Sequence, residues 1–168
     1  MDNSSELLDV VDSEDRVLGQ ATRGEVHAKG FLHRSVHILV FNSKGDLFLQ
    51  KRAMTKDENP GYWDSSASGH VNAGEDYLTC AHRELLEELG ISGELTFFAK
   101  YFACVETLWE HVETYRCLSD MKITPDPLEI SEGRFWTLPE LREALDRQAD
   151  QFTSTFSLIF DNYLKSKA

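Results

Sequence analysis

A spaced set of glycines and charged residues between Gly69 and Ile91 constrains this chain more than any other feature. The run reads G-x5-E-x7-R-E-U-x-E-E-x-G-U, where U is an aliphatic residue, and every defined position is filled. The pattern predicts a glycine loop that leads into a helix over residues 76–89, with Gly90 at the C-terminal cap.

The predicted helix carries three glutamates close together. Glu84 and Glu88 are four residues apart and share one face, while Glu87 lies at the edge of that face. Arg83 can pair with Glu87 and relieve part of the repulsion. A charge run of this kind is usually a solvated surface. Beside a glycine loop, however, clustered carboxylates also suit a hard divalent cation such as Mg²⁺, which takes oxygen ligands.

The loop itself has an expected geometry. Gly69 lets the chain approach a metal ion or phosphate closely, and Gly74 is expected to take positive φ in a turn. Glu75 stands at the start of the helix, where it favours the positive end of the helix dipole and can bond back to the loop. We expect Glu75 mainly to organise the loop.

Length and charge limit the function classes. The chain has 168 residues and a net charge of -12, which predicts a single domain over 1–168, with 1–30 as an N-terminal strand and loop extension. So acidic a protein lacks the basic surface that coats nucleic acid, and it binds phosphate groups readily only if metal ions bridge the anions. There is no run of eighteen apolar residues and no signal-peptide pattern, so no membrane segment and a cytoplasmic location are expected. The three cysteines, expected as reduced thiols, show no metal or disulfide spacing: Cys80, Cys104 and Cys117.

Hydrophobic patterning predicts an α+β domain with a mixed sheet. Apolar alternation and turn residues favour strands in the first two thirds, and helical periodicity appears around residue 80 and near the end. His27 falls in an expected loop. The expected strands are 7–11, 17–22, 33–42, 47–52, 95–107, 112–119 and 134–137, and the expected helices are 76–89, 139–148 and 155–165.

The run from Gly69 to Ile91 resembles the signature of the Nudix hydrolase family in full. A Pro-Gly-x-Trp segment ending at Trp63 precedes it, as in that family. The resemblance implies an α/β/α sandwich with a mixed sheet. It also implies hydrolysis of a diphosphate linkage in a nucleoside diphosphate derivative or another organic diphosphate, by water attack at phosphorus, with Mg²⁺ or Mn²⁺ as cofactor.

The resemblance carries over to individual residues. Glu84, Glu87 and Glu88 would bind metal, the main-chain carbonyl of Ser68 would be a further ligand, and Arg83 would orient the glutamates.

Two further roles lie outside the signature. Lys51 and Arg52 end a strand near the expected cleft and are the best candidates to hold the diphosphate of the substrate, since guanidinium groups bind phosphate in a bidentate manner. A solvent-facing basic strand end is nearly as good an interpretation. A general base outside the helix would come from Glu110, Glu113, Glu129 or Glu132.

A second resemblance is to the isopentenyl-diphosphate isomerase branch of the same superfamily, in the segment from Trp63 to His70. It implies a second metal site at His27, His33, His70 and Glu113, although the spacing between the first two histidines is one residue shorter than expected.

Two departures favour a hydrolase over an isomerase. The isomerases have a catalytic cysteine before the loop glycine, where this chain has Ser68, and a hydroxyl cannot replace a thiol of far lower pKa. The isomerases also usually degrade the glutamate signature, which is intact here. An isomerase-like enzyme and a non-catalytic ligand-binding Nudix module remain the alternatives. The small-molecule diphosphate itself and the oligomeric state stay open.

Overall fold

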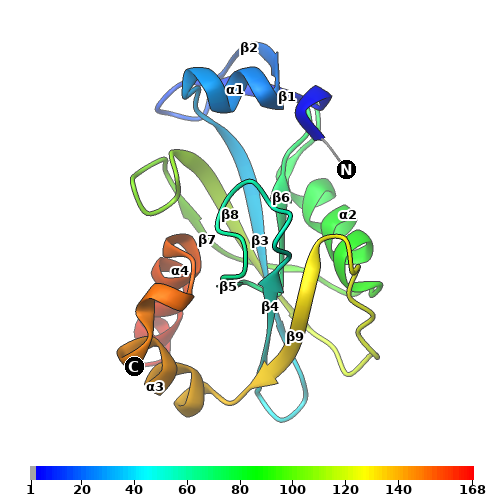
Figure 1. Ribbon diagram of the computed structural model, residues 1–168, viewed down its shortest axis with the longest axis vertical. Helices are drawn as coiled ribbons and strands as arrows, with labels where there is room; N and C mark the ends of the chain where they lie inside the picture. The colour runs from blue at the N-terminus through cyan, green and yellow to red at the C-terminus, as the bar shows by residue number, and fades with distance from the viewer. Residues whose placement is uncertain (1–2) are drawn as a thin grey trace.

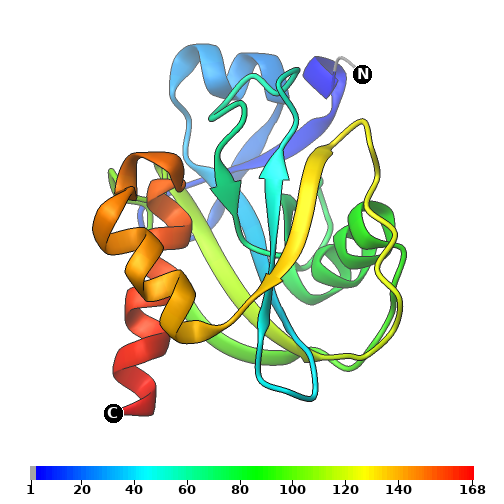
Figure 2. The same ribbon diagram turned by 60° about the horizontal axis from the view of Figure 1, so that its bottom comes forward.

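The computed structural model describes residues 3–168 and has three layers: a mixed sheet lies between α2 on one side and α3 and α4 on the other (Figure 1). The N-terminal hairpin and α1 lie at one end of the sheet, and the C-terminus lies at the opposite end. A view turned by 60° shows the same arrangement (Figure 2). The α+β prediction is thus confirmed. The strands are β1 (Leu7–Val11), β2 (Val17–Thr22), β3 (His33–Phe41), β4 (Leu47–Arg52), β5 (Trp63–Asp64), β6 (Ala67–His70), β7 (Thr96–Tyr101), β8 (Glu110–Leu118) and β9 (Ile130–Trp136); the helices are α1 (Arg23–Lys29), α2 (Tyr77–Leu89), α3 (Leu138–Arg147) and α4 (Ser154–Lys167), with short 3-10 turns at Asn3–Ser5 and Ala149–Gln151.

The central strand, β3, organises the main sheet. It pairs in parallel with β8 and antiparallel with β4 and β6, and the main path of the sheet runs β5-β4-β3-β8-β7. β9 pairs with β4, while β1 and β2 form a separate two-stranded sheet. The parallel pairing matters for function because it places the start of β8 beside the start of β3.

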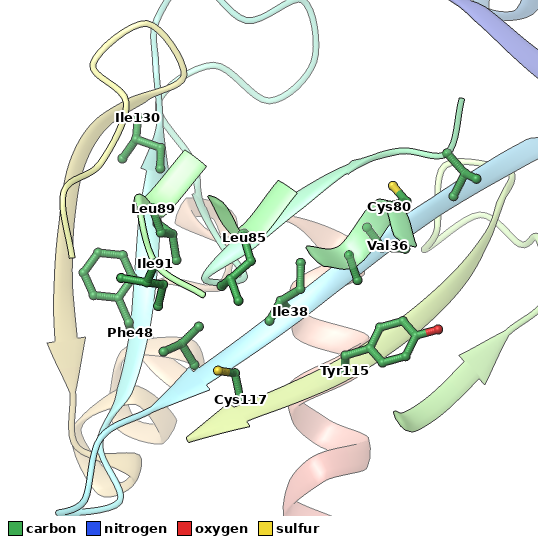
Figure 3. Close-up of a cluster of buried hydrophobic side chains, with 14 residues drawn as sticks. Val36, Ile38, Phe48, Cys80, Leu85, Leu89, Ile91, Tyr115, Cys117 and Ile130 are labelled. Carbon is green, nitrogen blue, oxygen red and sulfur yellow. The ribbon is translucent and has the colours of Figure 1, made fainter. Parts of the chain in front are cut away.

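Both faces of the sheet are covered by apolar side chains, so the core has two parts. Val36, Ile38 and Val40 alternate along β3 and pack under α2 with Leu85 and Leu89; Figure 3 shows this cluster. On the other face, Leu39 and Leu49 pack against aromatic side chains of α4, such as Phe156 and Phe160. The two-sided burial explains why β3 reads as a nearly continuous apolar run.

Several predicted boundaries needed correction. The segment around His27 is helix α1 rather than a loop, because Thr22 and Glu25 form a capping box at its start and Gly30 ends it at φ 66°. β9 begins at Ile130 rather than at residue 134, and β7 ends at Tyr101. On α2, Leu78 is 44% exposed, and the side chains that face the core begin at Cys80.

The N-terminal hairpin is fixed to the domain at its tip. The side chain of Asp15 accepts hydrogen bonds from Arg34 (2.6 Å), Tyr77 (2.9 Å) and Lys100. These three partners come from β3, α2 and β7. The hairpin therefore belongs to the same folded unit as the sheet, and it holds α1 above one end of that sheet.

Cys80 and Cys117 are buried, Cys104 is half-buried, and all three are free thiols, as expected. In the described chain no helix has the length and apolar character to cross a membrane.

Candidate active site

A cavity of about 510 Å³ opens where α2, β6 and α1 meet. Its lining includes the glutamates of α2, the serine, glycine and histidine of β6, loop residues 55–59, and the start of α4. The volume lies in the range of small-molecule sites.

Gly69 and Glu84 are in close contact at the base of the cavity. A Cβ atom built on Gly69 would lie 2.1 Å from the carboxyl carbon of Glu84. Only glycine therefore lets the β6 backbone approach this carboxylate. The backbone at Gly69 is closely approached by the side chain of Glu84, whereas its expected approach to a metal ion or phosphate stays a prediction. Gly74 has φ 76°, as expected for its turn.

Glu84 and Glu88 are both nearly buried, with 9% and 6% of their surface exposed. Oε2 of Glu88 accepts hydrogen bonds from Nε2 of Gln50 (2.7 Å) and from the main-chain N–H of Ser68 (3.1 Å). Burial raises the pKa of Glu84 to about 7 although Arg83 opposes the shift. Burial and the neighbouring Glu84 raise the pKa of Glu88 to about 8. Two adjacent carboxylates held out of water are costly unless a cation neutralises them.

Arg83 orients the carboxylates. Its guanidinium contacts both oxygens of Glu75 at 2.9 Å, Glu84 at 2.7 Å and Glu87 at 3.2 Å. Glu75 in turn accepts the main-chain N–H of Asn72 at 3.0 Å, which ties the loop to the helix as expected. Glu87, the outer member of the set, has a side chain that is 59% exposed.

Three histidines and one glutamate converge beside the cavity, and two of the four, His70 and Glu110, belong to its lining. Ligand-type atoms of His27, His33, His70 and Glu110 all lie within 4.8 Å of one another. Oε1 of Glu110 lies 3.0 Å from Nε2 of His70 and 3.2 Å from Nε2 of His33. The latter pair is an electrostatic contact whose alignment does not make a hydrogen bond. The three imidazoles come from α1, β3 and β6, so tertiary structure alone brings them together.

The charges in this cluster perturb one another. Burial alone would raise the pKa of Glu110, but the neighbouring His70 and His33 hold it well below its usual value. Burial alone would lower the pKa of His33, but the contact with Glu110 outweighs burial and raises it. Burial lowers the pKa of His27. Nε2 of His27 is buried without a partner in the described chain, as a nitrogen free to bind a metal would be.

Glu113 is not part of this cluster, and its predicted placement there is wrong. β8 begins at Glu110 rather than at residue 112, and its parallel register sets Glu110 beside His33. Residues three apart on a strand point to opposite faces. The Glu113 side chain accordingly accepts a hydrogen bond from Tyr115 (2.6 Å) and lies 3.5 Å from Lys100.

Strand β6 separates the two groups of candidate ligands. Gly69 faces α2 and Glu84, whereas its neighbours Ser68 and His70 point to the other face of the strand, beside His37 and Ser35 of β3. One strand thus presents its backbone to the glutamates and a side chain to the histidine cluster.

Comparisons with known proteins agree with this architecture. The NUDIX domain family matches residues 31–156. The chain belongs to the Nudix hydrolase family. It is 42% identical over 142 residues to an uncharacterized Nudix hydrolase of Pseudomonas aeruginosa, with 83% of this chain and 82% of that protein covered. It is 34% identical to isopentenyl-diphosphate Delta-isomerase 2 of Photorhabdus laumondii, with 93% and 91% covered. The crystal structure of DR0079 from Deinococcus radiodurans superposes with a TM-score of 0.74 at 28% identity, over 85% of this chain and 90% of that one.

As a Nudix hydrolase, the chain falls in a family that generally uses divalent metal ions and acts on diphosphates. The donor set fits such ions. Glu84 and Glu88 offer buried carboxylate oxygens with raised pKa values. The space beside Gly69 is filled by the Glu84 carboxylate, so no larger residue fits at position 69 with that carboxylate in place. The histidine cluster offers imidazole nitrogens and one carboxylate.

The basic residues predicted to bind substrate differ in their placement. Arg52 lines the Nudix cavity, where it bonds to the carbonyl of Glu58 (3.0 Å) and to Asp64 (3.4 Å). Lys51 does not belong to the lining within residues 3–168; it lies over the Trp63 ring, 3.9 Å from Glu132. Its assignment to the substrate is therefore not supported by the geometry.

Sequence reasoning missed two other cations of the cavity. Arg23, from α1, lies 3.1 Å from Asp57, and Lys56 forms an ion pair with Glu129. The capping box of Thr22 and Glu25 could have predicted that a helix begins at Arg23. Lys56 lies in a polar loop, where no sequence pattern marks it. Of the remaining base candidates, Glu129 lines the cavity and Glu132 does not.

Proposed function

We propose that this Nudix protein is a metal-dependent hydrolase that cleaves the diphosphate linkage of a nucleoside diphosphate derivative or another organic diphosphate by attack of water at phosphorus. One observation carries the proposal: Glu84 and Glu88 are held side by side, nearly buried, with pKa values raised by that burial. Such a pair is stable as a charged site only when cations are bound.

Glu84, Glu87 and Glu88 would hold Mg²⁺ or Mn²⁺, with the main-chain carbonyl of Ser68 as a further oxygen ligand. When bound, such ions offset the charge of the diphosphate and lower the pKa of water. Arg83 keeps two of these carboxylates in place through its bonds to Glu84 and Glu87, while Gln50 and the main-chain N–H of Ser68 hold Glu88.

Other side chains of the cavity bind the substrate and take up the proton. Arg52, Arg23 and Lys56 place positive charge where a diphosphate enters. Glu129 is the best-placed general base outside the helix, because it lines the cavity and its charge is felt by Glu84. The Glu129 carboxylate forms an ion pair with Lys56, which holds it at the cavity wall.

We infer a second metal site at His27, His33, His70 and Glu110. Its three nitrogens favour a transition ion such as Mn²⁺ over Mg²⁺. Because β6 runs between the two sites, the second ion lies on the other side of the strand from the glutamates of α2.

The proposal is tested by assaying nucleoside diphosphates, nucleotide sugars, dinucleotides and prenyl diphosphates with Mg²⁺ and with Mn²⁺. Glu88→Gln keeps the size of the side chain and removes the charge, so turnover should fall about 10²- to 10³-fold with the fold intact. Glu94→Gln changes an exposed glutamate beyond α2 and should leave turnover unchanged. Equal turnover of Glu88→Gln and wild type would refute the assignment.

An isomerase of isopentenyl diphosphate is the second candidate, favoured by the histidine cluster and by the similarity to an enzyme of that name. We favour the hydrolase over the isomerase because Ser68 stands where the isomerase resemblance requires a thiol. Incubation with isopentenyl diphosphate should yield no dimethylallyl diphosphate above background, and robust isomerisation would reverse this choice. A non-catalytic binding module is disfavoured because every signature carboxylate is present.

A further inference from the structure

The face of β3 that borders the cavity carries polar side chains deep inside the domain. Ser35 and His37 are two residues apart and share this face, with 3% and 6% of their surface exposed. Both line the cavity. The next residue on the same face, Leu39, already belongs to the apolar core against α4. The polar character is therefore confined to the end of the strand that meets the cavity.

The neighbouring strand extends this polar wall. In the antiparallel pairing of β3 with β6, Ser35 stands opposite His70 and His37 stands opposite Ser68. Directly opposite residues share a face, so all four side chains lie on one surface. The wall thus begins at the histidine cluster and runs inward from it.

One buried hydrogen-bonding atom of this wall has no partner within residues 3–168, and a neighbouring imidazole has one nitrogen already engaged. Oγ of Ser35 is buried and unpaired. The imidazole of His37, which lines the cavity, is held by a contact of 2.8 Å between its Nδ1 and Oγ of Ser65, so Nε2 is the ring nitrogen that a ligand would use. Buried polar atoms are normally paired, and leaving them unpaired against an apolar group costs stability.

The rest of the cavity gives little support to a hydrocarbon or a stacked base. Among the described residues, the apolar side chains that line it are Leu108 and Leu128, and no Phe, Tyr or Trp side chain does so. A long alkyl chain gains affinity by burying apolar surface against apolar surface. A hydroxyl group, in contrast, both donates and accepts, and can pair with a serine hydroxyl and an imidazole nitrogen at once.

We propose that Ser35 and His37 bind a hydroxyl group of the substrate, so that the diphosphate taken by this enzyme is attached to a sugar or another polyol rather than to a hydrocarbon chain. The inference rests on the proposed hydrolase function and names its substrate class. The serine and the histidine act as specificity residues and take no part in the attack on phosphorus.

Two five-carbon diphosphates test the inference. Ribose 5-diphosphate and isopentenyl diphosphate carry the same diphosphate group and differ mainly in their hydroxyls. With Mg²⁺ or Mn²⁺, wild-type enzyme should release phosphate from the ribose compound with a kcat/KM at least about tenfold higher. Ser35→Ala should lower this ratio about three- to tenfold, because one hydrogen bond to a hydroxyl is lost. The variant should fold normally, since it removes an unpaired buried group.

Thr114→Val is the matched control. The hydroxyl of Thr114 is also buried without a partner in the described chain, and the residue stands beside His37 on β8, but it does not line the cavity. This variant should leave the substrate ratio unchanged. Calorimetric titration of each variant with the methylenebisphosphonate analogues of both compounds gives the same comparison for binding alone.

The outcomes separate the two proposals. A preference for the isopentenyl compound, or an equal effect of Ser35→Ala on both compounds, overturns the polyol inference and leaves the hydrolase standing. Equal affinity for both analogues overturns it as well. If wild-type enzyme hydrolyses neither compound nor any diphosphate of the wider panel, the hydrolase proposal fails and the polyol inference fails with it.

Discussion

At the scale of single residues, the site depends on a contact that a glycine permits. The carboxylate of Glu84 occupies the space that a side chain at position 69 would fill. Position 69 must be glycine because the Glu84 carboxylate fills the space of a side chain there. Glu84 in turn is buried because the backbone of β6 lies against it. This contact is the physical reason for a glycine and a glutamate fifteen positions apart.

We predict that Gly69→Ala separates activity from stability. The new Cβ would lie 2.1 Å from the Glu84 carboxyl carbon, which is the movable end of a side chain. The carboxylate can move away, so the melting temperature should change little. A ligand displaced by about 1 Å should still lower turnover about 10²-fold. Gly19→Ala, whose Cβ would meet nothing within 4 Å, is the control. Unchanged turnover in Gly69→Ala would show that the contact has no catalytic importance.

A second residue-scale prediction concerns pH. Folding raises the pKa of Glu88 from 4.5 to about 8 through burial. Between these values the folded state binds more protons than the unfolded state, so this group's contribution to the free energy of unfolding falls as pH rises. Glu88→Gln lacks the effect. In the presence of a chelator, its stability relative to wild type should therefore increase by on the order of 2 kcal/mol from about pH 5 to about pH 8.

Urea denaturation of both proteins at several pH values measures this difference. The comparison cancels the contributions of titrating groups away from Glu88, such as the histidine cluster, and the measured difference belongs to Glu88 together with its neighbour Glu84. Parallel stability curves for the two proteins would mean that Glu88 is not held in a costly charged state, and the main support for a cation there would be lost.

At the scale of elements, local signals predicted well and long-range pairing did not. β1, β2 and α2 were predicted to within a residue, because each has alternation, turn residues or caps in its own sequence. β6 was not predicted, because its residues Ala67–His70 are mostly small or polar and lack the pattern of a strand. They are extended because they pair with β3. The parallel register of β3 and β8 has no local signal at all, and the wrong choice of Glu113 over Glu110 follows from that.

The N-terminal hairpin gives a prediction at this scale. Asp15 has only 7% of its side chain exposed and pairs with Arg34 and Lys100. Asp15→Asn would leave both cations partly buried without a countercharge, which should cost about 2–4 kcal/mol of unfolding free energy. Glu14→Gln, one residue earlier in an exposed position, should cost less than about 0.5 kcal/mol.

Activity should respond to Asp15→Asn as well, because the hairpin supports α1 and α1 carries Arg23 and His27 into the site. We expect a higher KM at temperatures where the variant is still folded. Denaturation and kinetics on the same preparations separate the two effects. A variant as stable as wild type would show that the hairpin tip does not anchor the extension.

At the scale of the whole molecule, the net charge of -12 and the paired cations of the cavity both oppose the binding of an anionic substrate. Among the described residues, the cations that line the cavity have acidic partners, such as Asp64 for Arg52 and Glu129 for Lys56. An anionic substrate thus enters an acidic site on an acidic protein. Divalent ions at both groups of ligands would reverse the local charge, so metal and substrate should bind together.

The two proposed metal sites lie on opposite faces of β6, and this leads to the last prediction. Calorimetric titration with Mn²⁺ at neutral pH should resolve two classes of site. His27→Gln should remove one class and Glu88→Gln the other, because the two ligand sets share no side chain. Binding at the histidine site should weaken as pH falls below about 7, since protonated imidazole cannot bind a metal and the raised pKa of His33 favours the proton. Loss of both classes in either variant would indicate a single site, and unaltered titration of His27→Gln would leave the histidines with a structural role only.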